Sequence, residues 1–192
     1  MRFLAVDESK RLVNACDEVF RQLVRGALFS GCWYAELAKV KVMDLDAANG
    51  SLRVDGKGRD TAVRHVSLTA EGEAFFKDLA AGRPGSELLF RRGEVGRTTR
   101  KDAANAAGWL KGDAKTPMWL ACKAAGIEPM TFHGLRHTYA SELVRRGVPL
   151  MMVAQQLGHR DTRMVEMHYG HLQLARRSRR GTGKAALGRP DP

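Results

Sequence analysis

Apolar residues recur at helical spacing near the start of the chain. They are Leu12, Cys16, Val19, Leu23 and Ala27. Side chains three and four positions apart share one face of an α-helix, so this spacing predicts one amphipathic helix. Ser9 is a candidate N-cap for it. The helix is expected to end near Gly31, because glycine tolerates the left-handed backbone of a C-terminal cap.

The hydrophobic period changes between Val40 and Leu68. The β-prone runs VKVMDLD, SLRV and VRHVSL are separated by AANG and DGKGRD, which have the composition of turns. Such short connections between successive strands favour antiparallel pairing. This region therefore predicts a small three-stranded antiparallel sheet.

Helical patterns fill most of the remaining chain. The run TAEGEAFFKDLAAG begins at Thr69, a good N-cap, and TPMWLACKAAG has Pro117 near its first turn. Residues 83–102 between them form a Gly- and Arg-rich connection. The last third holds three further helical patterns, each ending in glycine, over 131–147, 149–158 and 161–170. The predicted fold class is α+β, mainly α-helical with one small antiparallel sheet.

The chain carries a large positive charge that is not confined to one end. Its 192 residues are 44% hydrophobic, which is enough to build a core. Its 32 Lys and Arg against 21 Asp and Glu give a formal net charge of +11. From Ala175 onward, six basic residues stand against one acidic residue, so +5 lies in this tail and +6 in the rest. A basic body as well as a basic tail favours a polyanionic partner, most simply nucleic acid.

The three cysteines, Cys16, Cys32 and Cys122, have no C-x-x-C spacing and cannot all pair with one another. They indicate reduced thiols and an intracellular protein. The sequence has no run of about 18 apolar residues, the length a membrane-spanning helix needs. We therefore expect no membrane partner and a cytoplasmic, nucleoid-associated protein.

Candidate chemistry is concentrated in the pattern TFHGLRHTYASELVRRG. On a helix from Thr131, His133 and Arg136 lie on one face, where an imidazole and a guanidinium can point at one place. A simple solvent-facing polar stripe is the alternative. A metal site at His133 and His137 is a second alternative, but no third ligand stands at a fitting spacing, so we predict no metal.

Two more elements complete a pattern with these residues: His159 in LGH, and Tyr169 in MHYGHL. Together with FHGLRHTYAS, they resemble the tyrosine recombinases of the phage integrase family, whose hallmark is His-x-x-Arg, then Leu-Gly-His, then a nucleophilic tyrosine. The resemblance covers almost the whole chain. It implies a catalytic domain over residues 1–172, without the N-terminal DNA-clamping domain of the family, and a basic, disordered tail over 173–192.

The resemblance also implies a reaction. Tyr169 would attack a DNA phosphate to form a 3′-phosphotyrosyl link, with Arg136, His133 and His159 around the phosphate. The transition state carries extra negative charge on the phosphate oxygens, which a guanidinium fork can hold. In the family a hairpin lysine protonates the leaving oxygen, and Lys57 in VDGKGRD matches it, with Arg59 and Arg64 as nearby alternatives. No cofactor is implied, because the phosphotyrosine retains the bond energy for rejoining.

One position departs from the family pattern. The segment SGCWYAEL matches the family around its first arginine, but Trp33 stands where that arginine belongs. The loss of one oxyanion donor costs about 3–4 kcal/mol, on the order of 10²- to 10³-fold in rate. Either the chain is inactivated but still binds DNA, or another cation reaches the vacant place. The candidates are Lys39, Lys41 and Arg64. Trp33 is alternatively a core-packing residue.

We therefore expect an impaired site-specific recombinase domain with double-stranded DNA as its partner, a tetramer on DNA and a monomer without it. The expected DNA-binding residues are Lys57, Arg59, Arg64, Arg136 and Arg160. A non-catalytic DNA-binding or regulatory remnant of an integrase is the alternative function. A type IB topoisomerase, which shares the tyrosine chemistry, ranks third.

Overall fold

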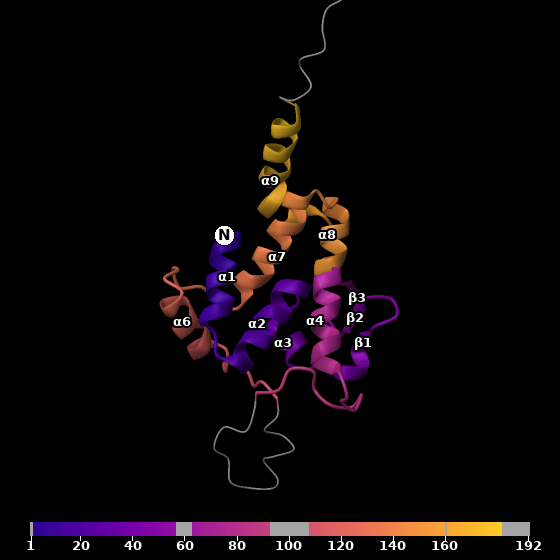
Figure 1. The fold of residues 1–192 in the computed structure, drawn as a ribbon. Coiled ribbons are helices and arrows are strands. Elements are labelled where there is room, and N and C mark those ends of the chain that lie inside the picture. The colour runs from indigo at the N-terminus through magenta and orange to yellow at the C-terminus, as the bar shows by residue number, and fades with distance from the viewer. Residues whose placement is uncertain (1, 57–62, 93–107, 160, 182–192) are drawn as a thin grey trace, which may run out of the picture.

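The computed structural model describes residues 2–56, 63–92, 108–159 and 161–181, with side chains up to residue 172 (Figure 1). Helices dominate it, and one three-stranded sheet packs at one side. The elements are α1 (Val6–Ala15), α2 (Glu18–Ser30), α3 (Tyr34–Leu37), the 3-10 helix η1 (Val42–Asp44), β1 (Leu45–Asp46), β2 (Ser51–Val54), β3 (Arg64–Ser67), α4 (Ala70–Ala80), α6 (Lys115–Ala124), α7 (His133–Arg146), α8 (Leu150–Leu157) and α9 (Arg163–Gly181). The predicted fold class is confirmed.

The N-terminal segment folds as two helices, so the prediction of a single helix was wrong. The chain leaves the helix at Cys16, whose backbone is extended, and restarts after Asp17. The Asp17 carboxylate accepts a hydrogen bond from the Phe20 N–H at 2.9 Å and caps α2. Ser9 lies inside α1 and is not its cap. The predicted end is correct, because Gly31 takes the left-handed backbone with φ 64°.

The sheet has the predicted antiparallel order β1-β2-β3. Its apolar positions face the core: Leu52 pairs with Val66, and both are fully buried. The first strand is shorter than expected, because residues 42–44 form the 3-10 helix η1. The Asp44 carboxylate accepts the Lys41 N–H at 2.8 Å, which favours this turn over an extended strand.

The later helices begin and end close to the predicted residues. Thr69 caps α4, Gly147 follows α7 and Gly158 follows α8. Both of these glycines have a positive φ. Helix α9, however, passes through Gly170, so the predicted end there was wrong. Gly170 does not take a positive φ, and the backbone stays helical to Gly181. The helix thus enters the segment that we expected to be a disordered tail, whereas residues 182–192 lie outside the described part.

The core has two parts that meet on α7. The larger part is formed by α1, α2, α4, α6 and the sheet, and includes Leu135 from the first half of α7. The smaller part is formed by α8, α9 and the second half of α7, and includes Tyr139 and Tyr169. Helix α7 thus runs between the two groups of elements (Figure 1). Within the described ranges, no helix is both long and apolar enough to cross a membrane.

Candidate active site

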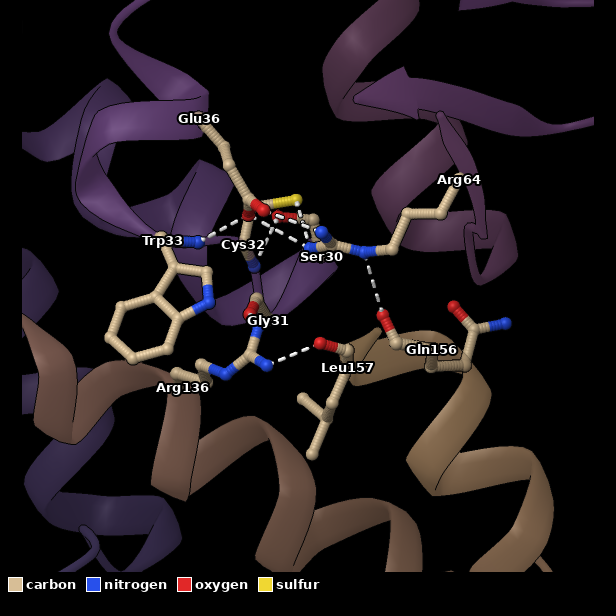
Figure 2. A network of polar contacts seen from close by, with 9 residues as sticks. All are labelled: Ser30, Gly31, Cys32, Trp33, Glu36, Arg64, Arg136, Gln156 and Leu157. Carbon is tan, nitrogen blue, oxygen red and sulfur yellow. Dashed lines mark hydrogen bonds and ion pairs between the residues drawn. The ribbon is translucent and has the colours of Figure 1, made fainter. Parts of the chain in front are cut away.

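Arg136 lies at the centre of the site, where α2, α7 and α8 meet (Figure 2). Arg136 is only 4% exposed, which excludes a solvent-facing polar stripe at this position. The guanidinium donates to the carbonyl of Gly31 at 2.8 Å and to the carbonyl of Leu157. Both carbonyls are at helix C-termini, where the helix dipole favours a cation. Burial, and then the charge of Arg64, lower the pKa of Arg136 to about 10, so it remains charged at neutral pH.

Trp33 covers this guanidinium. The Arg136 Cζ lies 4.8 Å from the centroid of the indole, and the same ring stacks on His133 at 4.4 Å between ring centroids, with an interplanar angle of 8°. Trp33 is 45% exposed, so it is not the core-packing residue of the alternative interpretation. A cation beneath an indole is attracted by the electrons of the ring. The uncharged side chain therefore lies on the surface of the site and shields its buried cation.

A row of aromatic contacts continues from Trp33 to the predicted nucleophile. His133 meets His137 edge to face at 4.4 Å, one helical turn further along α7. The Nδ1 atom of His137 lies 2.5 Å from the hydroxyl oxygen of Tyr169 on α9. Tyr169 is 4% exposed, and burial raises its pKa to about 12. Burial, then the neighbouring His133 and His168, lower the pKa of His137 to about 4.

His137 is the member of this row that sequence reasoning missed, because we considered it only as a metal ligand. Its position four residues after His133 did indicate that both rings share a face of α7. What the pattern could not indicate is the contact with Tyr169, which is 32 residues away in the sequence. No three His, Cys, Asp or Glu side chains gather as a possible metal site among the residues described.

The charge of Arg136 also acts on the two predicted site histidines, His133 and His159. Burial and the charge of Arg136 lower the pKa of His133, and the same two causes, with Arg64, lower that of His159. The same charge partly opposes the raised pKa of Tyr169. The structure thus brings the four predicted residues into one electrostatic neighbourhood.

Arg64 enters the same region from β3 (Figure 2). Its guanidinium binds both carboxylate oxygens of Glu36, at 2.5 and 2.8 Å, and its Nε donates to the carbonyl of Gln156 at 3.2 Å. It also lies 3.8 Å from the sulfur of Cys32, the residue before Trp33. The Arg64 side chain is 14% exposed in the free protein, and its predicted role as a DNA contact stays a prediction.

Two lysines were also considered for the vacant place. Lys41 is exposed, and its backbone pairs with Leu88, away from the Arg136 contacts. Lys39 lines a small hollow beside the sheet together with Glu36, Asp44 and Arg53. Lys57, Arg59 and Arg160 lie outside the described residues, and their roles stay predictions.

Comparison with known proteins identifies relatives of this chain and of its fold. The profile of the phage integrase family matches residues 2–176. The integrase of Salmonella phage P22 is 26% identical over 175 residues, covering 90% of this chain and 44% of that protein. The crystal structure of XerA recombinase superposes with a TM-score of 0.73 at 21% identity, over 97% of this chain and 66% of that one.

A further structure, the Tn1549 transposon integrase in complex with circular intermediate DNA, has a TM-score of 0.72 at 16% identity, over 96% of this chain and 67% of that one. At such identities the likeness of the two structures concerns the fold. The chain spans about half the length of the curated relatives it matches.

Proposed function

Since this chain belongs to the phage integrase family, we propose that it is the catalytic domain of a site-specific recombinase, with Tyr169 as the nucleophile. The observation that carries this proposal is the contact row that leads from the hydroxyl of Tyr169 through His137 and His133 to the site of Arg136. A nucleophile and a buried fixed cation are what phosphoryl transfer needs in one place.

In the proposed reaction the Tyr169 oxygen attacks phosphorus, and the bond from phosphorus to the 5′ oxygen breaks. Arg136 holds the non-bridging oxygens, with His133 and His159 as further donors or proton carriers around the same phosphate. Lys57 is proposed to give the leaving oxygen its proton. The reverse attack by a 5′ hydroxyl on the phosphotyrosine rejoins the strand, so no cofactor is consumed.

Trp33 is proposed to slow this reaction in two ways. An indole has one N–H donor and no charge, so the cation expected at this position is lost. In addition, the ring lies over Arg136 and stacks on His133, so a phosphate must share or displace that contact. The missing donor alone corresponds to about 3–4 kcal/mol of transition-state stabilisation.

Covalent trapping on nicked DNA tests the proposal. Because the target sequence is unknown, the substrate is a pool of duplexes randomised in sequence, each with a nick that lets the 5′-hydroxyl fragment leave. We expect a weak protein–DNA adduct from the native chain, an adduct rate on the order of 10²- to 10³-fold higher for Trp33→Arg, and none for Tyr169→Phe. Tyr34→Phe is the matched control, because the Tyr34 hydroxyl donates to the Leu110 carbonyl outside this row. Absence of adduct from Trp33→Arg would refute the proposal.

Double-stranded DNA is the proposed partner, supported by the net charge of +11 and by the DNA complex of the Tn1549 relative. We also propose a monomer that assembles into a tetramer on DNA. The second candidate function is a non-catalytic DNA-binding remnant, which the uncharged Trp33 favours. Affinity that falls steeply with salt, without adduct from the native or the Trp33→Arg chain, would support this candidate.

A further inference from the structure

We propose that His137 accepts the proton of Tyr169 as the tyrosine oxygen attacks phosphorus. This inference rests on the proposed function, and it assigns the first proton transfer of the reaction to a residue outside the His-x-x-Arg pattern. The contact that carries it is the 2.5 Å separation between His137 Nδ1 and the Tyr169 hydroxyl oxygen. A base must lie within hydrogen-bond reach of the proton that it takes, and His137 does so before DNA is bound.

The direction of this hydrogen bond follows from the surroundings of the two groups. Tyr169 is buried and its pKa is raised, so its oxygen carries the proton at neutral pH. The pKa of His137 is lowered, so its ring is neutral and has one nitrogen free to accept. Nδ1 therefore accepts from the hydroxyl, and Nε2 carries the ring hydrogen. In the free protein the proton rests on Tyr169.

Packing holds the His137 ring in this orientation. On one side of His137 lies His133, and the two rings meet edge to face with 4.4 Å between their centroids. On the side of α9 lies His168, whose ring centroid is 6.5 Å from that of His137. Among the described residues, the charged and titratable groups around His137 are His133 and Arg136 on α7, and His168 and Tyr169 on α9. Arg136 is the fixed positive charge among them, and in the free protein it disfavours a second positive charge on His137.

His133 does not compete for this role. Its ring is stacked beneath Trp33, and its Nδ1 is a buried nitrogen without a hydrogen-bond partner among the described residues. The hydroxyl of Tyr169 contacts His137 instead.

The reaction step balances with one proton taken and one given. As the bond from the Tyr169 oxygen to phosphorus forms, its proton moves to His137 Nδ1 and produces an imidazolium. The bond from phosphorus to the 5′ oxygen breaks, and that oxygen takes a proton from the proposed acid, Lys57. A DNA phosphate brings a negative charge to the site, which raises the pKa of a neighbouring imidazole and favours this transfer. Rejoining returns the proton to Tyr169.

Nitrogen NMR of the histidine rings tests the hydrogen bond in the full chain without DNA. We expect neutral His137 to be the tautomer with hydrogen on Nε2, and the Nδ1 resonance and the pKa of His137 to change in Tyr169→Phe. His171→Asn is the control, since His171 is an exposed histidine on the same helix. A hydrogen on Nδ1, or resonances that do not change in Tyr169→Phe, would overturn the proposal.

Single-turnover adduct formation tests the proton transfer, in the Trp33→Arg background that gives more adduct. His137→Asn keeps an amide oxygen near the position of Nδ1 but cannot take a proton at neutral pH, so it separates holding the tyrosine from accepting its proton. We expect a loss on the order of 10²- to 10⁴-fold, the usual contribution of a general base. The pH dependence should also lose the histidine inflection and rise steadily with hydroxide. His171→Asn should react as its parent does.

A His137→Asn rate and pH profile equal to those of the parent would overturn the proton transfer, and would leave His137 as a residue that only positions Tyr169. The loss of rate supports the proposal only if His137→Asn unfolds cooperatively near the parental midpoint. His137→Gln is the second variant, whose amide lies near the position of Nε2, and the same loss is expected from it. If the Trp33→Arg parent itself forms no adduct, the proposed function fails, whereas the NMR result on the hydrogen bond stands separately.

Discussion

The ion pair between Glu36 and Arg64 gives the sharpest prediction about stability. The pair joins α3 to β3 across the site, and the side chains are 6% and 14% exposed. Loss of one partner from a buried pair typically costs about 3–5 kcal/mol, because the other charge remains buried without compensation. Glu36→Gln leaves the guanidinium of Arg64 in this state. Arg64→Met leaves the carboxylate of Glu36 with the Trp33 N–H, at 2.7 Å, as its one remaining partner among the described residues.

The double variant removes both charges and should cost less than the sum of the two single variants. We expect a coupling of about 2–3 kcal/mol from the double-mutant cycle, at the upper end of the range for residues in contact. The measurement is urea unfolding of the four proteins at pH 7. For a chain of this size, each kcal/mol corresponds to about 2–4 °C in melting temperature, which gives an independent reading.

An exposed pair provides the matched control. Arg146 and Glu142 are four residues apart on α7, with side chains 64% and 36% exposed. The cycle of Glu142→Gln and Arg146→Met should give a coupling of about 0.5 kcal/mol or less. If Glu36 and Arg64 couple no more strongly than this pair, or if their effects are additive, the reasoning from burial is wrong.

The remaining predictions concern pH and one glycine. The pKa values of three site histidines are lowered in the folded chain, so below about pH 6.5 the unfolded chain takes up protons first and stability falls as the pH drops toward 4. Urea unfolding between pH 7.5 and 4.5 should show this slope, and a shallower one for His137→Phe; equal slopes would contradict it. Gly31→Ala should destabilise by more than about 2 kcal/mol, because φ is +64° and the new Cβ would lie 2.3 Å from the Tyr139 ring. Gly82→Ala, with a similar φ of +68° and no atom within 4 Å, should cost only about 1 kcal/mol.

Local chemistry explains why most of the fold was predictable. Thr69, Gly147 and Gly158 mark helix ends through backbone preferences that act within a few residues, so the sequence alone reveals them. The break before α2 was missed because Leu12 and Cys16 are both buried, so the apolar spacing continues across it. The carboxylate of Asp17 offers a competing cap that hydrophobic spacing does not record.

The contacts of the site likewise divide into local ones, which the sequence predicts, and distant ones, which it does not. Arg136 and His133 are one turn apart on one helix, and their proximity follows from spacing. The contact of His137 with Tyr169 spans 32 residues, and that of Arg64 with Glu36 spans 28. These contacts depend on how α9 and β3 pack against the rest of the protein. The periodicity of a single segment does not show how distant segments pack. The sequence therefore identified His137, Tyr169 and Arg64 as candidates but not the contacts that they make.

The charges in the site explain how the chain accommodates an uncharged residue at position 33. Arg136 and Arg64 are both buried, and the charge of Arg64 lowers the pKa of Arg136. Glu36 compensates one of these cations, and the carbonyls of Gly31 and Leu157 partly compensate the other. Because Glu36 is already paired with Arg64, a third guanidinium at position 33 would add a like charge to the site in the free protein, and a bound phosphate would be its natural counterion. Trp33 avoids that repulsion and also stabilises Arg136 through its ring. Trp33 therefore favours the stability of the free domain, and under the proposed function it does so at the expense of a cation for the phosphate.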